Sequence, residues 1–351
     1  MPVKVFVYPV SKNSLYVPLT FRGISNQYMP LLGEDGDIDR AIEHVKAHGL
    51  ALLHIQWEEL IFLRSLSVED ADSALERFRD RLLRFRSLGG RTVVTIHNEV
   101  PHTIKYREHF LAARQLAADA SQVILVHSAH AADVVRAQIE VDPAKLSVLP
   151  HPSYLDCYEA EAVAVHGLGT PSDGTVLGFG AIREQKGFGE LIDMLPVPFL
   201  EETGVHIKIA GTGHYAKTIM AGHHDRPDVA WDIRYVPHGE AMVMIRSALC
   251  VALVYKRFLT SGVAHLVISA GGLFVAPDVP QHRDLLPAVN HAFLFKAGDA
   301  DDFRRAVRAV AALSAEERLR AKQANLEVAR GLRPEIISKR LAAVYDTALS
   351  G

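Results

Sequence analysis

At 351 residues the chain is longer than a single hydrophobic core usually supports, so its length predicts two domains of roughly 150 to 180 residues. Its 38 basic and 41 acidic residues give a formal net charge of −3, which excludes a nucleic-acid footprint over the whole chain. The two cysteines, Cys157 and Cys250, are too few for a disulfide framework or a cysteine zinc site, and no apolar run reaches the ~18 residues of a membrane span.

The first 150 residues alternate between β-rich runs and amphipathic segments. Strands are expected at Val3–Tyr8, Leu50–Ile55, Arg91–His97, Gln122–Val126 and Lys145–Leu149. Helices are expected at Asp35–His48, Val68–Leu88, Thr103–Asp119 and Ala129–Gln138. Because parallel strands need crossover connections, this alternation predicts a doubly wound parallel sheet with helices on both faces.

Residues 153–173 lose this periodicity and are rich in glycine, proline and acidic residues, as a linker would be. The alternation then restarts, with strands expected at Thr175–Phe179, Val205–Ala210, Val229–Tyr235, Val251–Val254, Leu273–Ala276 and Ala292–Phe295. Helices are expected at Gly187–Leu195, His214–Ala221, Glu240–Ala248, Gly262–Ala270, Asp299–Leu313, Ser314–Arg330 and Pro334–Leu349.

The predicted fold class is therefore α/β, with two Rossmann-like, doubly wound domains at residues 1–155 and 156–333 and a ligand cleft between them. Residues 334–351 are expected to form a helix that returns to the first domain. We expect a cytoplasmic protein, because the first residues lack the long apolar segment of a secretion signal and scarce cysteines suit a reducing compartment.

The loop from Tyr255 to Gly262 follows a predicted strand, and ligands of such sheets bind beyond the carboxyl ends of the strands. Ser261 is the expected N-cap of the next helix, which leaves the N–H groups of Gly262 and Val263 free for an anion. These features predict a diphosphate site. The alternative is an ordinary βαβ unit with a capping serine.

The sequence LGFGAIREQKGFGELID, from Leu177 to Asp193, has a strand that ends in a glycine loop bearing Arg183 and Lys186. Two cations beside a helix N-terminus at Gly187 suit a diphosphate. A second glycine loop, AGTG at residues 210–213, follows the next strand. The spacing matches neither GxGxxG nor the P-loop, which argues against NAD binding and ATP hydrolysis. The alternative is a solvated loop whose cations pair with neighbouring glutamates.

In this order, the motifs GxIRxxKGxxxLI, IAGTG and YxxxxxSGxxxxxxSAGGxxVAP resemble the donor half of GT-B glycosyltransferases. The chain resembles most closely the bacterial exopolysaccharide mannosyltransferases of the xanthan and acetan pathways. HIQWEEL at His54–Leu60 and TIHNEVPH at Thr95–His102 are similar to segments of that family. The resemblance implies a GT-B fold, a nucleotide-sugar donor with GDP-mannose as the first expectation, a lipid-diphosphate-linked saccharide acceptor, and neither a cofactor nor a metal.

The resemblance also implies the residues that hold the donor, which are Arg183, Lys186, Gly187, Gly211, Tyr255, Lys256, Ser261 and Gly262. The large retaining branch of this fold carries two glutamates eight residues apart, where this chain has Ser261 and Ser269. A serine can cap a helix and bind a phosphate, but it cannot make a charged contact with sugar hydroxyls. We therefore expect an inverting reaction, as in the subgroup with the same serine pair.

An inverting transfer needs a base that takes the proton of the acceptor hydroxyl. The candidates at strand ends of the first half are Glu58, Glu59, His97 and Glu99. Glu59 and His97 are the expected catalytic residues because they match the family segments. Either could instead be structural, Glu59 by stabilising a helix start and His97 by orienting a loop. Contacts to the acceptor or sugar are expected from Trp57, Asn98 and His102.

The segment 73–88 carries five arginines, and Leu75, Phe78, Leu82 and Phe85 form an apolar stripe along it. Such a helix could rest on anionic lipid at the inner face of the plasma membrane, as a transferase with a lipid-linked acceptor requires. The alternative is that the stripe is core and the arginines are a solvated face. Two other functions remain open: a nucleotide-sugar epimerase on the same scaffold, and an inactive nucleotide-binding partner protein.

Overall fold

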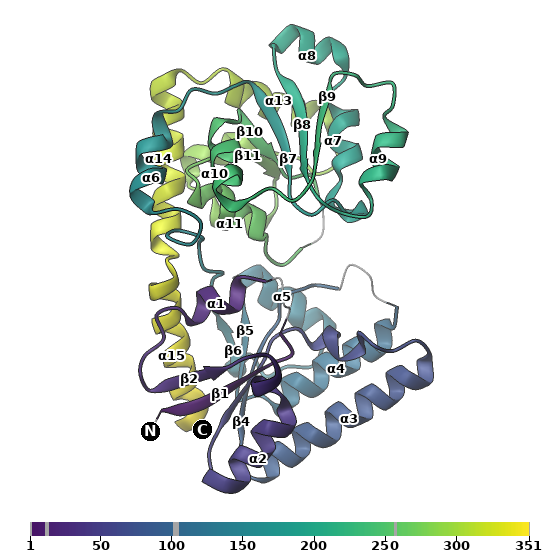
Figure 1. Ribbon diagram of the computed structural model, residues 1–351, viewed down its shortest axis with the longest axis vertical. Coiled ribbons are helices and arrows are strands. Elements are labelled where there is room, and N and C mark those ends of the chain that lie inside the picture. Colours follow the sequence, from purple (N-terminus) through teal and green to yellow (C-terminus); the bar gives the residue numbers. More distant parts are fainter. Residues whose placement is uncertain (1, 11–13, 101–104, 256–257, 351) are drawn as a thin grey trace. The chain divides into compact units, whose positions relative to one another are not determined.

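The structure is a computed structural model that describes residues 2–10, 14–100, 105–255 and 258–350 (Figure 1). It divides the chain into two compact units. The first unit comprises Met1–Pro152 with Pro334–Gly351, and the second comprises Ser153–Arg333. Each unit contains one parallel sheet with its own buried core.

The sheet of the first unit has six strands in the order β2-β1-β3-β4-β5-β6, and every neighbouring pair is parallel. The strands are β1 (Val3–Tyr8), β2 (Tyr28–Leu31), β3 (Leu52–Ile55), β4 (Arg91–Thr95), β5 (Val123–Val126) and β6 (Leu146–Val148). All residues of β3 and β5 are buried, because helices cover both faces of a doubly wound sheet. The strand order reverses between β1 and β3, where such sheets bind ligands.

The helices of the first unit pack against the sheet or against one another. They are α1 (Tyr16–Phe21), α2 (Ile38–His48), α3 (Val68–Ser87), α4 (Arg107–Ala120), α5 (Ala129–Gln138) and α15 (Pro334–Ser350), with 3-10 turns η1 (Gly33–Gly36), η2 (Glu58–Phe62) and η3 (Pro143–Lys145). Helices α2, α3 and α4 pack side by side, whereas α15 packs on α1, β4 and β5 (Figure 1).

The apolar stripe of α3 lies in the core of the first unit. The side chains of Phe78, Leu82 and Phe85 are at most 3% exposed, and the helix packs on α2 and α4. The apolar side of this helix is therefore not available to a lipid surface. The structure therefore supports the interpretation that the apolar stripe is core. Any lipid contact of α3 would involve its arginines.

The last helix, α15, is an integral part of the first unit. The Tyr345 hydroxyl lies 2.6 Å from Nδ1 of His54 on β3, and both residues are fully buried. The Ser338 hydroxyl donates to the carbonyl of Thr20 on α1 at 2.7 Å. These polar contacts fix α15 against the sheet in one position, because a buried polar group without a partner would be costly.

The sheet of the second unit has the order β12-β11-β10-β7-β8-β9, again with parallel pairs throughout. The strands are β7 (Thr175–Phe179), β8 (His206–Gly211), β9 (Val229–Ile233), β10 (Cys250–Ala252), β11 (Phe274–Pro277) and β12 (Leu294–Phe295). This is the Rossmann order, and it reverses between β7 and β10. The predicted α/β class with two doubly wound parallel sheets is confirmed.

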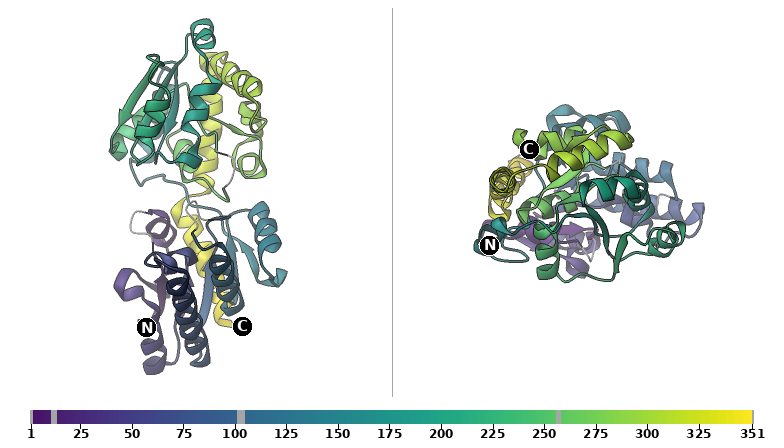
Figure 2. Two further views of the ribbon diagram at one scale, coloured as in Figure 1. Left: turned by 90° about the vertical axis from the view of Figure 1, so that its right-hand side faces the viewer. Right: turned by 90° about the horizontal axis from the view of Figure 1, so that it is seen from above.

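Helices cover both faces of the second sheet (Figure 2). They are α6 (Glu161–His166), α7 (Phe188–Met194), α8 (Val197–Thr203), α9 (Ala216–Gly222), α10 (His238–Ser247), α11 (Gly262–Ser269), α12 (Pro280–Leu285), α13 (Ala300–Ala311) and α14 (Ala315–Gly331), with 3-10 turns η4 (Gly167–Gly169), η5 (Glu184–Lys186) and η6 (Ala288–Phe293). One core cluster joins α7, α9 and α13 to the sheet, and a second joins α10, α11 and α14.

Five of the helices and strands in the described residues were not predicted from the sequence: β2, α1, α6, α8 and α12. Strand β2 contains Pro30, which is tolerated there because β2 is an edge strand. Helix α6 lies inside the expected linker, where ion pairs of Glu161 with Arg330 and Arg333 fix it. Within the described ranges, every helix is too short or too polar to cross a membrane.

Candidate functional site

Aromatic rings gather at the carboxyl end of the first sheet, beside the reversal of strand order. Strand β3 leads into Trp57 and β4 into His97, and the two rings stack with centroids 4.4 Å apart and an interplanar angle of 16°. The ring of Tyr16, from α1, meets His97 edge-on at 4.6 Å. The structure therefore brings together Trp57 and His97, two residues that the sequence singled out separately.

Both ring nitrogens of His97 are engaged by side chains. Nε2 lies 2.7 Å from Oε1 of Gln56, and Nδ1 lies 3.2 Å from Nε2 of His127. Burial, followed by the charges of neighbouring histidines, lowers the pKa of His97 well below its ordinary value. Both ring nitrogens of His97 are thus occupied by neighbouring side chains, and its ring stacks on Trp57.

His127 and His151 complete this ring cluster and were missed by the sequence analysis. Both rings pack against Tyr16 with centroids 5.2 Å away, and Nδ1 of His127 lies 2.9 Å from the carbonyl oxygen of Leu149. His127 directly follows the buried strand β5, in VILVH, and His151 follows the edge strand β6 after two further residues, in SVLPH. A polar residue near the carboxyl end of a parallel strand is a signal that could have identified them.

Glu59 and Asn98 form a second pair at the same edge. Nδ2 of Asn98 donates to Oε1 of Glu59 at 2.6 Å. Burial, and then the charge of Glu58, raises the pKa of Glu59 to about 7, against hydrogen bonds from its backbone N–H and Asn98 and the charge of Arg114. A carboxylate that titrates near neutrality can accept a proton and later release it, as general base catalysis requires.

The remaining candidates of the first half are less accessible or lie outside the described residues. Glu58 is 1% exposed and pairs with Arg114, so a substrate does not reach it. Glu99 contributes its backbone carbonyl to Arg114. His102, an expected acceptor contact, lies outside the described residues.

In the second unit, Ser261 caps α11 as expected. Its hydroxyl accepts a hydrogen bond from the Ala264 N–H at 3.1 Å and is also hydrogen-bonded to the Tyr255 hydroxyl. The first N–H groups of a helix have no partner within the helix, so those of Gly262 and Val263 suit an anion. A Cβ atom on Gly262 would lie only 3.1 Å from the Tyr154 hydroxyl, so a larger residue would crowd the start of α11.

Lys186 joins the loops after β7 and β10 at the reversal point of the second sheet. Its Nζ lies 4.0 Å from the ring centroid of Tyr255, a cation–π contact. Burial, and then the charge of Arg183, lowers the pKa of Lys186 to about 8. A bound anion would favour the charged form of Lys186 and so offset the free-energy cost of burying its charge. Arg183 is itself exposed on the same loop, and Lys256 lies outside the described residues.

Two of the expected glycines permit close approach of backbones. Gly187 has φ +69° and a Cβ atom there would lie 2.7 Å from Cγ2 of Val254. Gly211 has φ +137°, and its Cβ would lie 1.9 Å from the carbonyl oxygen of Gly180. No side chain larger than glycine fits at Gly211, because the backbone of the loop after β7 lies directly against it.

Ser269 has a structural role. It is fully buried, its hydroxyl donates to the carbonyl of His265 at 2.6 Å, and it accepts from the Tyr154 N–H at 2.9 Å. Both interactions are internal to the second unit, so Ser269 does not stand in for a glutamate that would bind a sugar.

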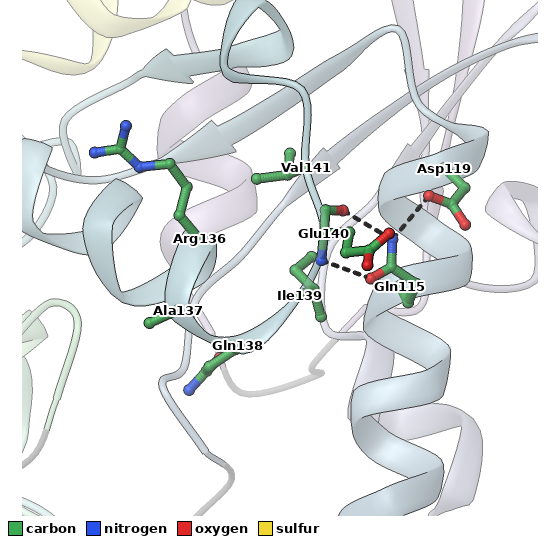
Figure 3. A pocket seen from close by; sticks show the side chains of 8 residues that line it. All are labelled: Gln115, Asp119, Arg136, Ala137, Gln138, Ile139, Glu140 and Val141. Carbon is green, nitrogen blue, oxygen red and sulfur yellow. Dashed lines mark hydrogen bonds between the residues drawn. The ribbon is translucent and has the colours of Figure 1, made fainter.

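A hollow of about 870 Å³ lies on the first unit between α4 and the segment after α5 (Figure 3). Its lining residues are Gln115, Asp119, Arg136, Ala137, Gln138, Ile139, Glu140 and Val141. The Gln115 amide binds both backbone groups of Glu140, at 2.8 and 2.9 Å, and Asp119 at 2.8 Å. Because these groups satisfy one another, we assign no ligand to this hollow.

No protein-family model and no curated protein sequence matches the chain. Solved structures do match. HepE of Anabaena in complex with UDP superposes with a TM-score of 0.68 at 11% identity, over 99% of this chain and 100% of that one. The α,α-trehalose 6-phosphate synthase of Burkholderia multivorans gives 0.64 at 13% identity, over 95% and 83%. The pneumococcal O-GlcNAc transferase GtfA, in complex with UDP and GlcNAc, gives 0.60 at 14% identity, over 87% and 59%. The chain therefore shares the GT-B fold of these proteins.

Proposed function

We propose that this protein is a glycosyltransferase that moves a sugar from a nucleotide sugar to a hydroxyl of a lipid-linked saccharide, with inversion. The observation that carries the proposal is the carboxyl edge of the second sheet, where Lys186, the capped start of α11 and the glycine loops converge. Cations and the N–H groups at a helix start are what a sugar diphosphate needs. That a fold relative binds UDP supports the same assignment.

The donor half would stabilise the leaving diphosphate. As the bond between sugar C1 and the diphosphate oxygen breaks, its electron pair stays on the diphosphate, and negative charge grows there. Lys186 and Arg183 would neutralise this charge, and the N–H groups of Gly262 and Val263 would donate to the phosphate oxygens. Gly187 and Gly211 let the backbone approach, while Tyr255 holds Ser261 in its capping position.

The acceptor half would activate the nucleophile. The acceptor hydroxyl loses its proton to the Glu59 carboxylate while its oxygen forms the new bond to C1 from the face opposite the diphosphate. Asn98 orients Glu59, and Trp57 offers an indole face to a pyranose ring. His97 is proposed to keep Trp57 in place, rather than to act as the base.

The donor proposed from the family resemblance is GDP-mannose, in exopolysaccharide biosynthesis, whereas the complexes with UDP favour uridine. Thermal-shift measurements with GDP, UDP, ADP and dTDP at equal concentration decide between them, because only the nucleotide that binds the folded state raises Tm. The transfer assay then uses sugars linked to the selected nucleotide as donors and lipid-linked saccharides as acceptors. The proposal fails if no nucleotide shifts Tm and no sugar is transferred.

A second candidate is an inactive nucleotide-binding protein that serves as a partner in a synthase complex. The internal hydrogen bonds of Ser269, at one of the two positions where the retaining branch has glutamates, favour it. This candidate predicts a Tm shift with one nucleotide and no transfer or hydrolysis with any donor.

The acceptor chemistry implies a cytoplasmic protein that works at the inner face of the membrane. Because the apolar stripe of α3 is core, the proposed contact is electrostatic and uses the exposed arginines of that helix.

A further inference from the structure

The residue before Glu59 belongs to a fully buried ion pair. Glu58 is the first residue of η2 and Arg114 is on α4, and each is 1% exposed. Nε of Arg114 donates to Oε1 of Glu58 at 2.7 Å. The guanidinium also lies 4.3 Å from the ring centroid of Phe110. Replacing a buried ion pair by apolar side chains of similar volume is often neutral or stabilising, so stability alone is a weak reason for this pair.

Arg114 also fixes the loop that carries Asn98. Its Nη2 donates to the carbonyl of Asn98 at 2.6 Å, and its Nη1 donates to the carbonyl of Glu99 at 3.0 Å and to Oε1 of Gln138. Gln138, from α5, donates in turn to the Glu99 carbonyl at 2.9 Å. One guanidinium therefore holds η2 and the loop after β4, which are the two segments that meet in the Glu59–Asn98 hydrogen bond.

The charge of Glu58 is only partly satisfied. Its Oε2 is buried and, among the described residues, accepts no hydrogen bond. The titratable side chains on the elements packed against η2 include Arg114 and His109 of α4 and Asp72 of α3. His109 and Asp72 pair with each other at 2.8 Å, near Phe62 at the far end of η2. Of the charged neighbours of Glu59, Glu58 raises the pKa of its carboxyl and Arg114 lowers it.

We propose that Glu58 and Arg114 are a positioning pair for Glu59: Arg114 binds Glu58 in η2 and the carbonyls of Asn98 and Glu99, and so fixes the two segments that bring Glu59 and Asn98 together. This inference rests on the proposed function, since Glu59 is a base only if transfer occurs. Neither residue touches the substrate. Their effect reaches the reaction through Glu59 and Asn98.

The test is a titration of the Glu59 carboxyl by NMR in the full chain with ¹³C-labelled glutamate, the signal being assigned with Glu59→Gln. In Glu58→Gln the like charge is gone and the amide still accepts from Arg114, so the midpoint of Glu59 should fall by about 1 pH unit. Glu76→Gln, which removes an exposed carboxylate of α3, is the matched control and should leave the midpoint unchanged.

Arg114→Lys keeps the charge but loses the planar fork that binds the two carbonyls. We expect its transfer rate to fall at least tenfold at every pH, with the donor Kd unchanged. Arg136→Lys, at an exposed arginine of α5, is the matched control for this change. The double variant Glu58→Met/Arg114→Met covers the case in which single variants do not fold, and it should lose at least tenfold in rate and titrate at lower pH.

A wild-type midpoint in Glu58→Gln, or a wild-type rate in Arg114→Lys or in the double variant, would overturn the positioning role. The titration does not need turnover. If the wild-type protein transfers no sugar but the midpoint shifts as expected, the proposed function fails while the action of the pair on Glu59 stands.

Discussion

The carboxyl of Glu59 is the side chain whose protonation should control the proposed reaction. With a pKa raised to about 7 by burial and Glu58, it is a base above pH 7 and an acid below it. The transfer rate should therefore rise with pH and level off above about 7. Glu59→Gln should lower the rate by about 100-fold or more and remove this rise, measured as kcat/KM between pH 5 and 9.

The raised pKa of Glu59 also predicts how the folding stability of the protein changes with pH. The unfolded carboxyl ionises near 4.5 and the folded one near 7, so the folded state binds the proton more tightly and loses stability as pH rises across this window. Glu59→Gln should therefore raise Tm relative to wild type at pH 8 and leave it nearly unchanged at pH 4. An equal Tm difference at both pH values would contradict the buried, raised carboxyl.

Lys186 should control the affinity for the donor at alkaline pH, above the range in which Glu59 titrates. Because burial and Arg183 lower its pKa to about 8, donor affinity should decline as pH rises above 8. Lys186→Ala should weaken nucleotide binding, lower turnover by at least about 100-fold and abolish this decline, as measured by calorimetry and transfer. Lys217→Ala, at an exposed lysine of α9, is the control. Near-normal turnover of Lys186→Ala would remove the lysine from the site.

At the scale of elements, the buried hydrogen bond between Tyr345 and His54 should contribute to the stability that α15 gives the first unit. In Tyr345→Phe the ring remains while Nδ1 of His54 loses its partner in a fully buried site. We expect the free energy of unfolding to fall by about 1–3 kcal/mol in urea titrations. Tyr235→Phe, at a tyrosine that is 65% exposed, should change it by much less. Equal effects would mean that the His54 contact adds nothing.

The two-sheet architecture of the whole molecule could be predicted from the sequence, because strands that are buried on both faces are uniformly apolar. Strands such as β5 (VILV) are covered on both faces and therefore appear as apolar runs, which predicts two parallel sheets. The pair Glu59–Asn98 could not be predicted, because residues 39 apart meet only through the register that sets Ile55 beside Val94. Arg114 was missed because an arginine in an alanine-rich helix is usually a surface residue.

The proposed membrane contact is a property of the whole molecule, because the formal net charge of −3 must be outweighed by a local face. On α3, Arg79 pairs with Glu76 and Arg81 with Asp39, whereas Arg77 and Arg84 are exposed. Near an anionic surface each such arginine contributes about 1 kcal/mol.

We therefore expect the full chain to sediment with phosphatidylglycerol vesicles at low salt and to be released at high salt, since the attraction is screened. Phosphatidylcholine vesicles should not bind it. Arg77→Gln/Arg84→Gln should weaken binding about tenfold or more, while Arg320→Gln, at an exposed arginine of α14, serves as the control. Binding that is equal on neutral vesicles, or unchanged in the double variant, would show that α3 does not carry the contact, because an electrostatic face must respond to both lipid charge and arginine number.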